Sequence, residues 1–333
     1  MLFNKSSNGA AEMKSLLGFI YATKSFENMI TDIELASDEL ISLLGAEFYR
    51  EIESFYHSGG YDNPGNDPVK IVWKELVHRV QLPIAFYAYR SFAAHGDLTH
   101  SDKGRQILVS EFEKPAFEWM IMRDDHSMLM KAHKLTDRLL QFLDENKTDE
   151  KILAKWINTE VYKASKDNLI SSAAAFDAIF PIHQSRRFYL KVLPFIREVE
   201  RTRLIPVLTR ETYEGLIAFI RYPNASDNPL LNYTRIPLVM YTMAIAARRL
   251  AVEILPDGVF QNYISGTQSA RAKNPVEMEF KTEVAQLLDK QGDHALSALQ
   301  QYLAKMAAQN AGTCFSQESL TERHSSENQF FRA

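Results

Sequence analysis

Two segments that lie 164 residues apart carry the same pattern of apolar residues, and this repetition constrains the fold of the 333-residue chain more than any other feature. The segments read ISLLGAEFYREIESF at 41–55 and IPVLTRETYEGLIAF at 205–219. In both, apolar residues recur at spacings of three and four, which places them on one face of a helix. A fixed internal period is the signature of a repeated structural unit, so one unit is predicted to occur twice.

Four further anchors follow each segment in the same order. Asn or Asp before proline, in NDP at 66–68 and DNP at 227–229, predicts the first turn of a helix. A long apolar helix then runs through Pro83 or Pro237, where it is expected to be kinked or interrupted. In both halves a glycine turn follows this proline by 21 residues, and its apolar flanks predict a β-hairpin. Each half closes with a predicted helix, which begins in KPAFEWM or NPVEMEF.

The predicted fold is therefore mainly α-helical, a tandem duplication of one helical unit in which each copy carries a β-hairpin. An extended, polar C-terminal tail follows the second copy. The length also favours two domains, since domains commonly have roughly 100 to 200 residues. The predicted order is repeat 1, a connector that can form a bridging helix, repeat 2 and a C-terminal arm, at residues 14–146, 147–167, 168–305 and 306–333.

The composition is that of a folded globular protein, with 46% hydrophobic, 11% aromatic and 24% charged residues. A net charge of −4 argues against a general nucleic-acid binder and limits any DNA contact to a local patch. The single cysteine, Cys314, excludes an internal disulfide framework. No secretory signal is visible, and the longest apolar run, 236–247, is shorter than the ~20 residues of a membrane helix. Synthesis and use in the cytoplasm, without a membrane, are predicted.

The common catalytic and nucleotide-binding motifs are absent, including the P-loop, the dinucleotide fingerprint, the hydrolase elbow and the zincin helix. Glu75 and His78 form one ExxH pair, a spacing that helical di-iron sites use twice, but the second half offers no partner. HGDLTH at 95–100 could titrate near neutrality or hold a metal, and RDDH at 123–126 could bind an ion. The favoured interpretation is a polar turn before a strand for HGDLTH and a solvated helix face for RDDH. No enzyme, cofactor or metal is therefore predicted.

The surfaces of the two units are the remaining candidates for function. Hairpins offer strand edges to a neighbour, and the aromatic pair in the tail offers apolar anchors. The arginines of 186–210 could face nucleic acid or an acidic partner, or could pair with carboxylates of the same protein. The candidate partner-binding residues are Asp102, Lys103, Gly104, Pro256, Asp257 and Gly258 in the hairpin turns, Arg186, Arg187, Arg197, Arg201 and Arg203 in the stripe, and Phe330 and Phe331 in the tail.

Three unusual strings, QLPIA, EKPAFEW and SRRFYLKVLPFIREVE, resemble an uncharacterised family encoded by tailed phages and prophages of Bacteroidetes, crAss-like phages included. The resemblance extends over about residues 15–305, and the family is similar to head-tail connector or adaptor proteins of the phage neck. It implies a structural virion protein that forms a ring of twelve copies. This ring would dock on the portal protein, contact other neck or tail ring proteins, line the DNA exit channel and touch passing DNA transiently.

An ordinary adaptor carries one such unit, so the two copies in this chain are expected to meet different neighbours, the second facing the portal or DNA. Two other classes remain open. One is a DNA-binding protein, or another phage assembly protein outside the neck; DNA binding would need the arginines to form one open basic face. A helical enzyme would need a polar cluster that the fold assembles in a pocket between the copies.

Overall fold

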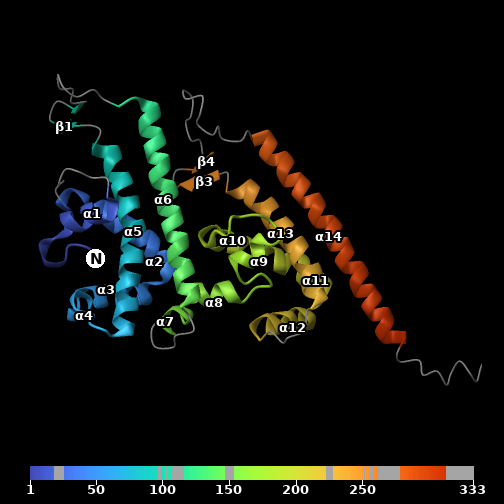
Figure 1. Ribbon diagram of the computed structural model, residues 1–333. Coiled ribbons are helices and arrows are strands. Elements are labelled where there is room, and N and C mark those ends of the chain that lie inside the picture. The colour runs from blue at the N-terminus through green and yellow to red at the C-terminus, as the bar shows by residue number, and fades with distance from the viewer. Residues whose placement is uncertain are drawn as a thin grey trace, which may run out of the picture.

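The computed structural model describes residues 1–18, 26–96, 99–101, 104–106, 116–146, 154–222, 228–250, 252–255, 258–261 and 278–312. Of the strand residues, only the backbone is described. The fold is mainly helical, as predicted (Figure 1).

The first half contains a helical body, a short strand pair and a long closing helix. Its elements are η1 (Lys5–Ser7), α1 (Gly9–Leu17), η2 (Phe26–Met29), α2 (Ile30–Leu44), α3 (Ala46–His57), α4 (Gly59–Asp62), α5 (Pro68–Gly96), β1 (Thr99–Ser101), β2 (Gly104–Gln106) and α6 (Glu118–Glu145).

Two short helices in the connector, α7 (Ala154–Ile157) and α8 (Glu160–Lys166), lead into the second half. Its elements are α9 (Ala173–Asp177), α10 (Arg186–Val199), the π-helical turn η3 (Glu200–Leu204), α11 (Ile205–Leu208), α12 (Arg210–Arg221), α13 (Pro229–Arg249), β3 (Val252–Leu255), β4 (Gly258–Gln261) and α14 (Met278–Gly312).

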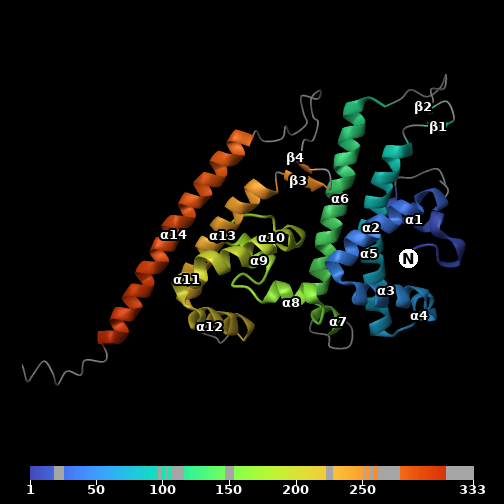
Figure 2. The same ribbon diagram turned by 180° about the vertical axis from the view of Figure 1, so that it is seen from behind.

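Each half is built around a pair of long antiparallel helices, α5 with α6 and α13 with α14 (Figures 1 and 2). Helix α10 lies between the pairs and contacts both α6 and α13. The helical halves therefore lie side by side, joined through the face of α6 that points away from α5.

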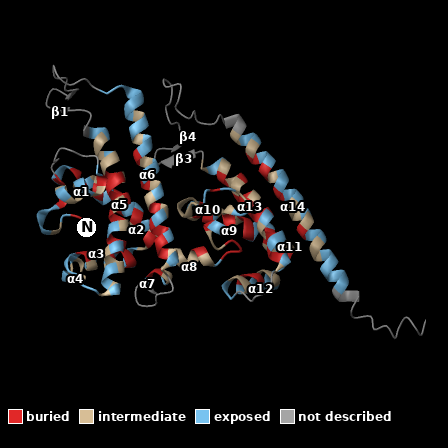
Figure 3. Cartoon of the chain, in the orientation of Figure 1, coloured by how far each residue is buried: buried red, intermediate tan, exposed pale blue. Residues whose placement is uncertain are grey.

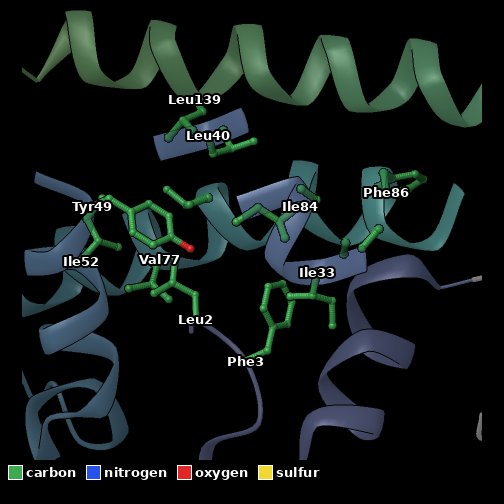
Figure 4. Close-up of a cluster of buried hydrophobic side chains, with 14 of the residues drawn as sticks. Leu2, Phe3, Ile33, Leu40, Tyr49, Ile52, Val77, Ile84, Phe86 and Leu139 are labelled. Carbon is green, nitrogen blue, oxygen red and sulfur yellow. The ribbon is translucent and has the colours of Figure 1, made fainter. Parts of the chain in front are cut away.

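The first half has its own hydrophobic core, in which side chains of α2, α3, α5 and α6 meet. Leu139 of α6 lies close to Leu40 of α2, and Ile84 of α5 completes this layer (Figure 4). All three side chains are fully buried. The connector joins this core through Trp156, whose ring centroid lies 5.9 Å from that of Phe48. Burial of Trp156 is therefore what fixes the connector against the first half.

A second core fills the space between α10, α13 and α14, with Val192, Leu238 and Leu299 fully buried. Leu190 of α10 packs against both cores. Apolar burial of this kind stabilises each half, at roughly 25 cal/mol per Å² removed from water.

The predicted starts of the two proline-bearing helices are confirmed. The Asp67 carboxylate accepts a hydrogen bond from the Val69 N–H (3.0 Å), and the Asn228 side chain accepts one from the Leu230 N–H (3.1 Å). In both cases proline occupies the first helical position, where its missing N–H leaves no partner unsatisfied.

The predicted interruption at the internal prolines is wrong, because α5 continues through Pro83 and α13 continues through Pro237. A proline removes one backbone hydrogen bond and crowds the carbonyl four residues earlier, but its own φ suits a helix. Ile84 and Leu238, the residues that follow, are fully buried. Packing on the core therefore keeps each helix continuous across its proline.

In both halves the first matched segment, 41–55 or 205–219, contains a residue with positive φ. Gly45 (φ 85°) separates α2 from α3, and Thr209 (φ 69°) separates α11 from α12, 164 residues later. Glycine adopts this conformation without steric cost, whereas threonine is strained there. The same sharp change of chain direction is thus made twice.

The short strand pairs follow α5 and α13. Thr99 pairs with Gln106, and Val252 pairs with Gln261, both antiparallel. The residues between the strands, Asp102, Lys103, Pro256 and Asp257, lie outside the described part of the chain, as do the tail residues Phe330 and Phe331. Of the turn glycines, Gly104 and Gly258, only the backbone is placed, as the first residues of β2 and β4. Partner binding through these turns and the tail stays a prediction.

Helix α14 continues to Gly312, past residue 306, where the C-terminal arm is predicted to begin. The segment from Ala304 to Ala311 contains four alanines, which have the strongest helix propensity, and no proline. Residues 313–333 lie outside the described part.

A close approach between α13 and α14 leads to a first testable expectation. A Cβ atom on Gly292 would lie 2.7 Å from Cε1 of Tyr241, whereas a Cβ atom on Gly215 in α12 would meet open space. We expect Gly292→Ala to lower the free energy of unfolding by about 1 to 3 kcal/mol through overpacking. The control Gly215→Ala is expected to raise it by about 0.5 to 1 kcal/mol. Urea unfolding of both variants measures the difference, and equal effects would disprove the close packing.

Candidate functional site

The N-terminal end of α6 carries a concentrated group of exposed apolar side chains. Phe117, Trp119, Met120 and Ile121 are 68%, 44%, 37% and 41% exposed, respectively, and we call these four residues the α6 apex. Figure 3 shows this end of α6 as exposed. Large apolar side chains that gather on a surface commonly mark an interaction site.

The apex lies at the start of α6, before the first buried residue of that helix. The Met120 N–H donates to the Phe117 carbonyl (2.8 Å), and the first buried residue of α6 is Met128. The guanidinium of Arg123 lies 5.2 Å from the ring centroid of Trp119, which leaves the rest of that ring open. The first two turns of α6 therefore present apolar surface outside the body of the first half.

The arginines predicted as one stripe do not act together. The Nε of Arg186 lies 3.0 Å from Oδ2 of Asp144 on α6, Arg197 donates to the Ala164 carbonyl on α8 (2.9 Å), and Arg203 lies over the ring of Tyr241 on α13 (4.7 Å). Arg187 is half-buried and Arg201 is exposed. Three of the five thus hold α10 and η3 against three different elements, and these three do not form the open basic face that a DNA-binding regulator requires.

A carboxylate of the first half, that of Asp137, caps helix α10 of the second half. Asp137 of α6 accepts hydrogen bonds from the Arg187 N–H (2.8 Å) and the Ser185 hydroxyl (2.9 Å). The first N–H groups of a helix lack intrahelical partners and carry partial positive charge, so an anion there is stabilising. Asp137 therefore fixes the position of α10 relative to α6.

The π-helical turn η3 buries one carboxyl group, that of Glu200, which is 2% exposed. It accepts hydrogen bonds from the Leu169 N–H (2.7 Å) and the Tyr213 hydroxyl (3.1 Å). Burial raises the pKa of Glu200 to about 7, although these two donors and the nearby Arg197 oppose the rise. Glu200 can therefore change its protonation near neutral pH.

The π-helical hydrogen-bond pattern of η3 has a local cause. The Ile205 N–H donates to the Glu200 carbonyl, five residues earlier, and Pro206 directly follows. Proline has no N–H and its ring crowds the carbonyl four residues before it, which favours a local departure from α-helical pairing. Glu200 was not predicted as a candidate site residue, because arginines surround it in the sequence. It lies four residues from Ile196 and four from Leu204, both fully buried, and this spacing places Glu200 on the buried face of the helix.

The polar residues of the ExxH and RDDH motifs form ion pairs within the protein or lie on its surface. Glu75 pairs with Arg79 (Oε1–Nε 2.9 Å) while His78 is exposed, and Asp125 of the RDDH motif pairs with Arg90 (2.7 Å). Asp97 lies outside the described residues. In the part of the chain that the structure describes, no group of three or more His, Cys, Asp or Glu residues could hold a metal ion. None of the described helices has the length and apolar character to span a membrane.

Comparison with known proteins gives one match. A model of a family of unknown function matches residues 40–166 and 204–321, together well over half of the chain. No curated protein and no solved structure matches.

Proposed function

The chain belongs to this family of unknown function, DUF6712, and we propose that it is a structural virion protein of the phage neck. In this proposal it forms a connector or adaptor ring that docks on the portal and lines the DNA exit channel. The strings that resemble phage neck proteins, QLPIA, EKPAFEW and SRRFYLKVLPFIREVE, support the assignment. The α6 apex supports it independently, because its four apolar side chains are exposed.

We also propose that the chain arose by duplication of one helical unit. The two segments that match the family model begin at 40 and 204, 164 residues apart, the same spacing as between Gly45 and Thr209. In each half, a helix, a sharp break, a second helix, a proline-bearing long helix, a short strand pair and a closing helix follow in the same order. A chance repetition would not preserve both the order and the backbone break.

The α6 apex is the single observation that carries the assembly role. Several large apolar side chains exposed at one end of a helix are a common mark of a binding surface. Phe117 and Trp119 have the aromatic character that dominates binding energy at protein interfaces. In a ring, each copy would present this apex to the portal and a different face to the next copy, a heterologous contact that closes by rotation.

Electron microscopy of the purified protein mixed with its cognate portal, beside each alone, tests the proposal. We expect an additional ring at the narrow end of the portal, and its subunit number gives the copy number. A portal that stays bare beside a monodisperse monomer or dimer would overturn the neck-ring assignment.

A further inference from the structure

A cleft of about 380 Å³ opens between α2, α5 and α6 in the first half. Four residues of α2 line it at positions i, i+3, i+4 and i+7, and therefore form one stripe along that helix. These residues are Asp32, Leu35, Ala36 and Glu39; α5 adds Tyr87, Arg90, Ser91, Ala94 and His95, and α6 adds Asp125.

The charges that line this cleft are not balanced. Arg90 is held by both oxygens of Asp125, at 2.7 and 3.0 Å. Asp32 and Glu39 form no ion pair with any other described residue. Leu35, between them on the same stripe, is 61% exposed. The α2 wall thus combines an exposed apolar side chain with two carboxylates that have no ion-pair partner among the described residues.

The second half fills the corresponding place with its own cations. Tyr87 and Tyr241 each lie four residues after the internal proline of their helix. The guanidinium of Arg203 lies 4.7 Å from the centroid of the Tyr241 ring, and the residue 164 positions before Arg203 is Glu39. A cation over a tyrosine face is attracted by the negative charge of the ring. The tyrosine position in this unit therefore accommodates a guanidinium.

The C-terminal ends of α5 and α13 also differ: α13 carries arginines at positions where α5 has smaller or uncharged side chains. Arg248 and Arg249, eleven and twelve residues after Pro237, pair with Asp289 and Glu198. The residues eleven and twelve positions after Pro83 are Ala94 and His95, both of which line the cleft. The smaller alanine leaves space where the second half places an arginine. Burial raises the pKa of the Tyr87 hydroxyl and the nearby Arg187 opposes the rise, but Arg187 does not line the cleft.

We propose that this cleft receives an arginine side chain of a partner protein, with its guanidinium over the Tyr87 ring and paired with Glu39. Asp32, two turns earlier on α2, adds negative potential along the approach, about 10 Å away along the helix axis. Leu35 contacts the aliphatic part of the incoming side chain. The inference rests on the proposed role in assembly for the existence of a partner chain, while the arginine site belongs to the first half alone.

Binding of a single blocked arginine tests the site without the portal. We expect N-acetyl-arginine methylamide to shift the backbone amide signals of Leu35 and Ala94 in a 15N NMR titration that saturates at millimolar concentration. The matched probe is the citrulline analogue, which has nearly the same shape and no charge, and we expect at least tenfold weaker binding for it, about 1.4 kcal/mol.

Variants of α2 complete the test. Glu39→Gln is expected to weaken binding of the arginine analogue severalfold, whereas Asp38→Asn, an exposed residue of α2 that does not line the cleft, is expected to leave it unchanged. Equal binding of the arginine and citrulline analogues, no binding of either, or full binding by Glu39→Gln would each overturn the proposal. A bare portal in the microscope with intact arginine binding would instead reject the neck ring and keep the cleft site.

Discussion

Replacing Glu200 by glutamine is expected to remove a pH dependence of about 3 kcal/mol from the stability of the protein. The pKa of this buried carboxyl is raised to about 7 from an ordinary value of 4.5 in the unfolded chain. The folded state therefore binds the proton more tightly than the unfolded state does. This contribution is fully present below pH 4.5 and is lost as the pH rises to about 7.

Each pKa unit corresponds to about 1.4 kcal/mol, which sets the size of the expected loss. Glutamine keeps the shape of the side chain and carries no titrating proton. The free energy of unfolding, from urea titrations at pH 5, 6, 7 and 8, should fall for the natural protein relative to the Glu200→Gln variant.

Glu198→Gln, two positions before Glu200, is the matched control. Glu198 is half-exposed and pairs with Arg249 at the surface, where an ion pair contributes only about 0 to 1 kcal/mol. Removal of the Glu198 charge is expected to change the free energy of unfolding by a similar small amount at each of the four pH values. Parallel pH profiles for the natural protein and Glu200→Gln would show that Glu200 does not titrate between pH 5 and 8.

Replacing Phe117 and Ile121 together by aspartate is expected to prevent addition of the ring to the portal. Both side chains are exposed and belong to the α6 apex, so the folded chain loses little stability. Anchor residues at an interface contribute about 2 kcal/mol or more each, and buried, unpaired charge adds a further cost. Affinity should therefore fall by roughly 100-fold or more, measured by co-purification with the portal.

Tyr222→Asp is the control for this pair. Tyr222 is 78% exposed at the end of α12 in the second half and lies outside the apex. The Tyr222→Asp substitution also replaces an exposed aromatic side chain by a carboxylate. It is expected to leave portal binding unchanged. Full binding by the Phe117→Asp, Ile121→Asp variant would show that the apex is not an assembly contact.

The parts of the fold that the sequence predicts are those with local causes. Asp67 and Asn228 cap their helices through the backbone two residues later, so the sequence alone places both helix starts. The order of elements follows from the spacing of apolar residues along each helix. The continuation of α5 through Pro83 was not predictable, because it depends on burial of the helix against α2 and α6.

The functional surfaces were harder to predict because they arise where distant segments meet. The pairing of Arg186 with Asp144 joins residues 42 positions apart, and nothing near Arg186 in the sequence indicates it. The exposure of the α6 apex depends on where the rest of the first half ends, although its aromatic residues are visible in the sequence. Glu39 and Tyr87 line one cleft only because α2 packs against α5.

The capping of α10 by Asp137 also determines an order of events during synthesis. The N-terminal half leaves the ribosome first, and domains generally fold as they emerge. Until α6 has formed, the Arg187 N–H of α10 and the Ser185 hydroxyl before it have no carboxylate to accept their hydrogen bonds. We therefore expect the first half to act as the template on which the second half begins its helix, so that the chain matures from its N-terminus towards its C-terminus.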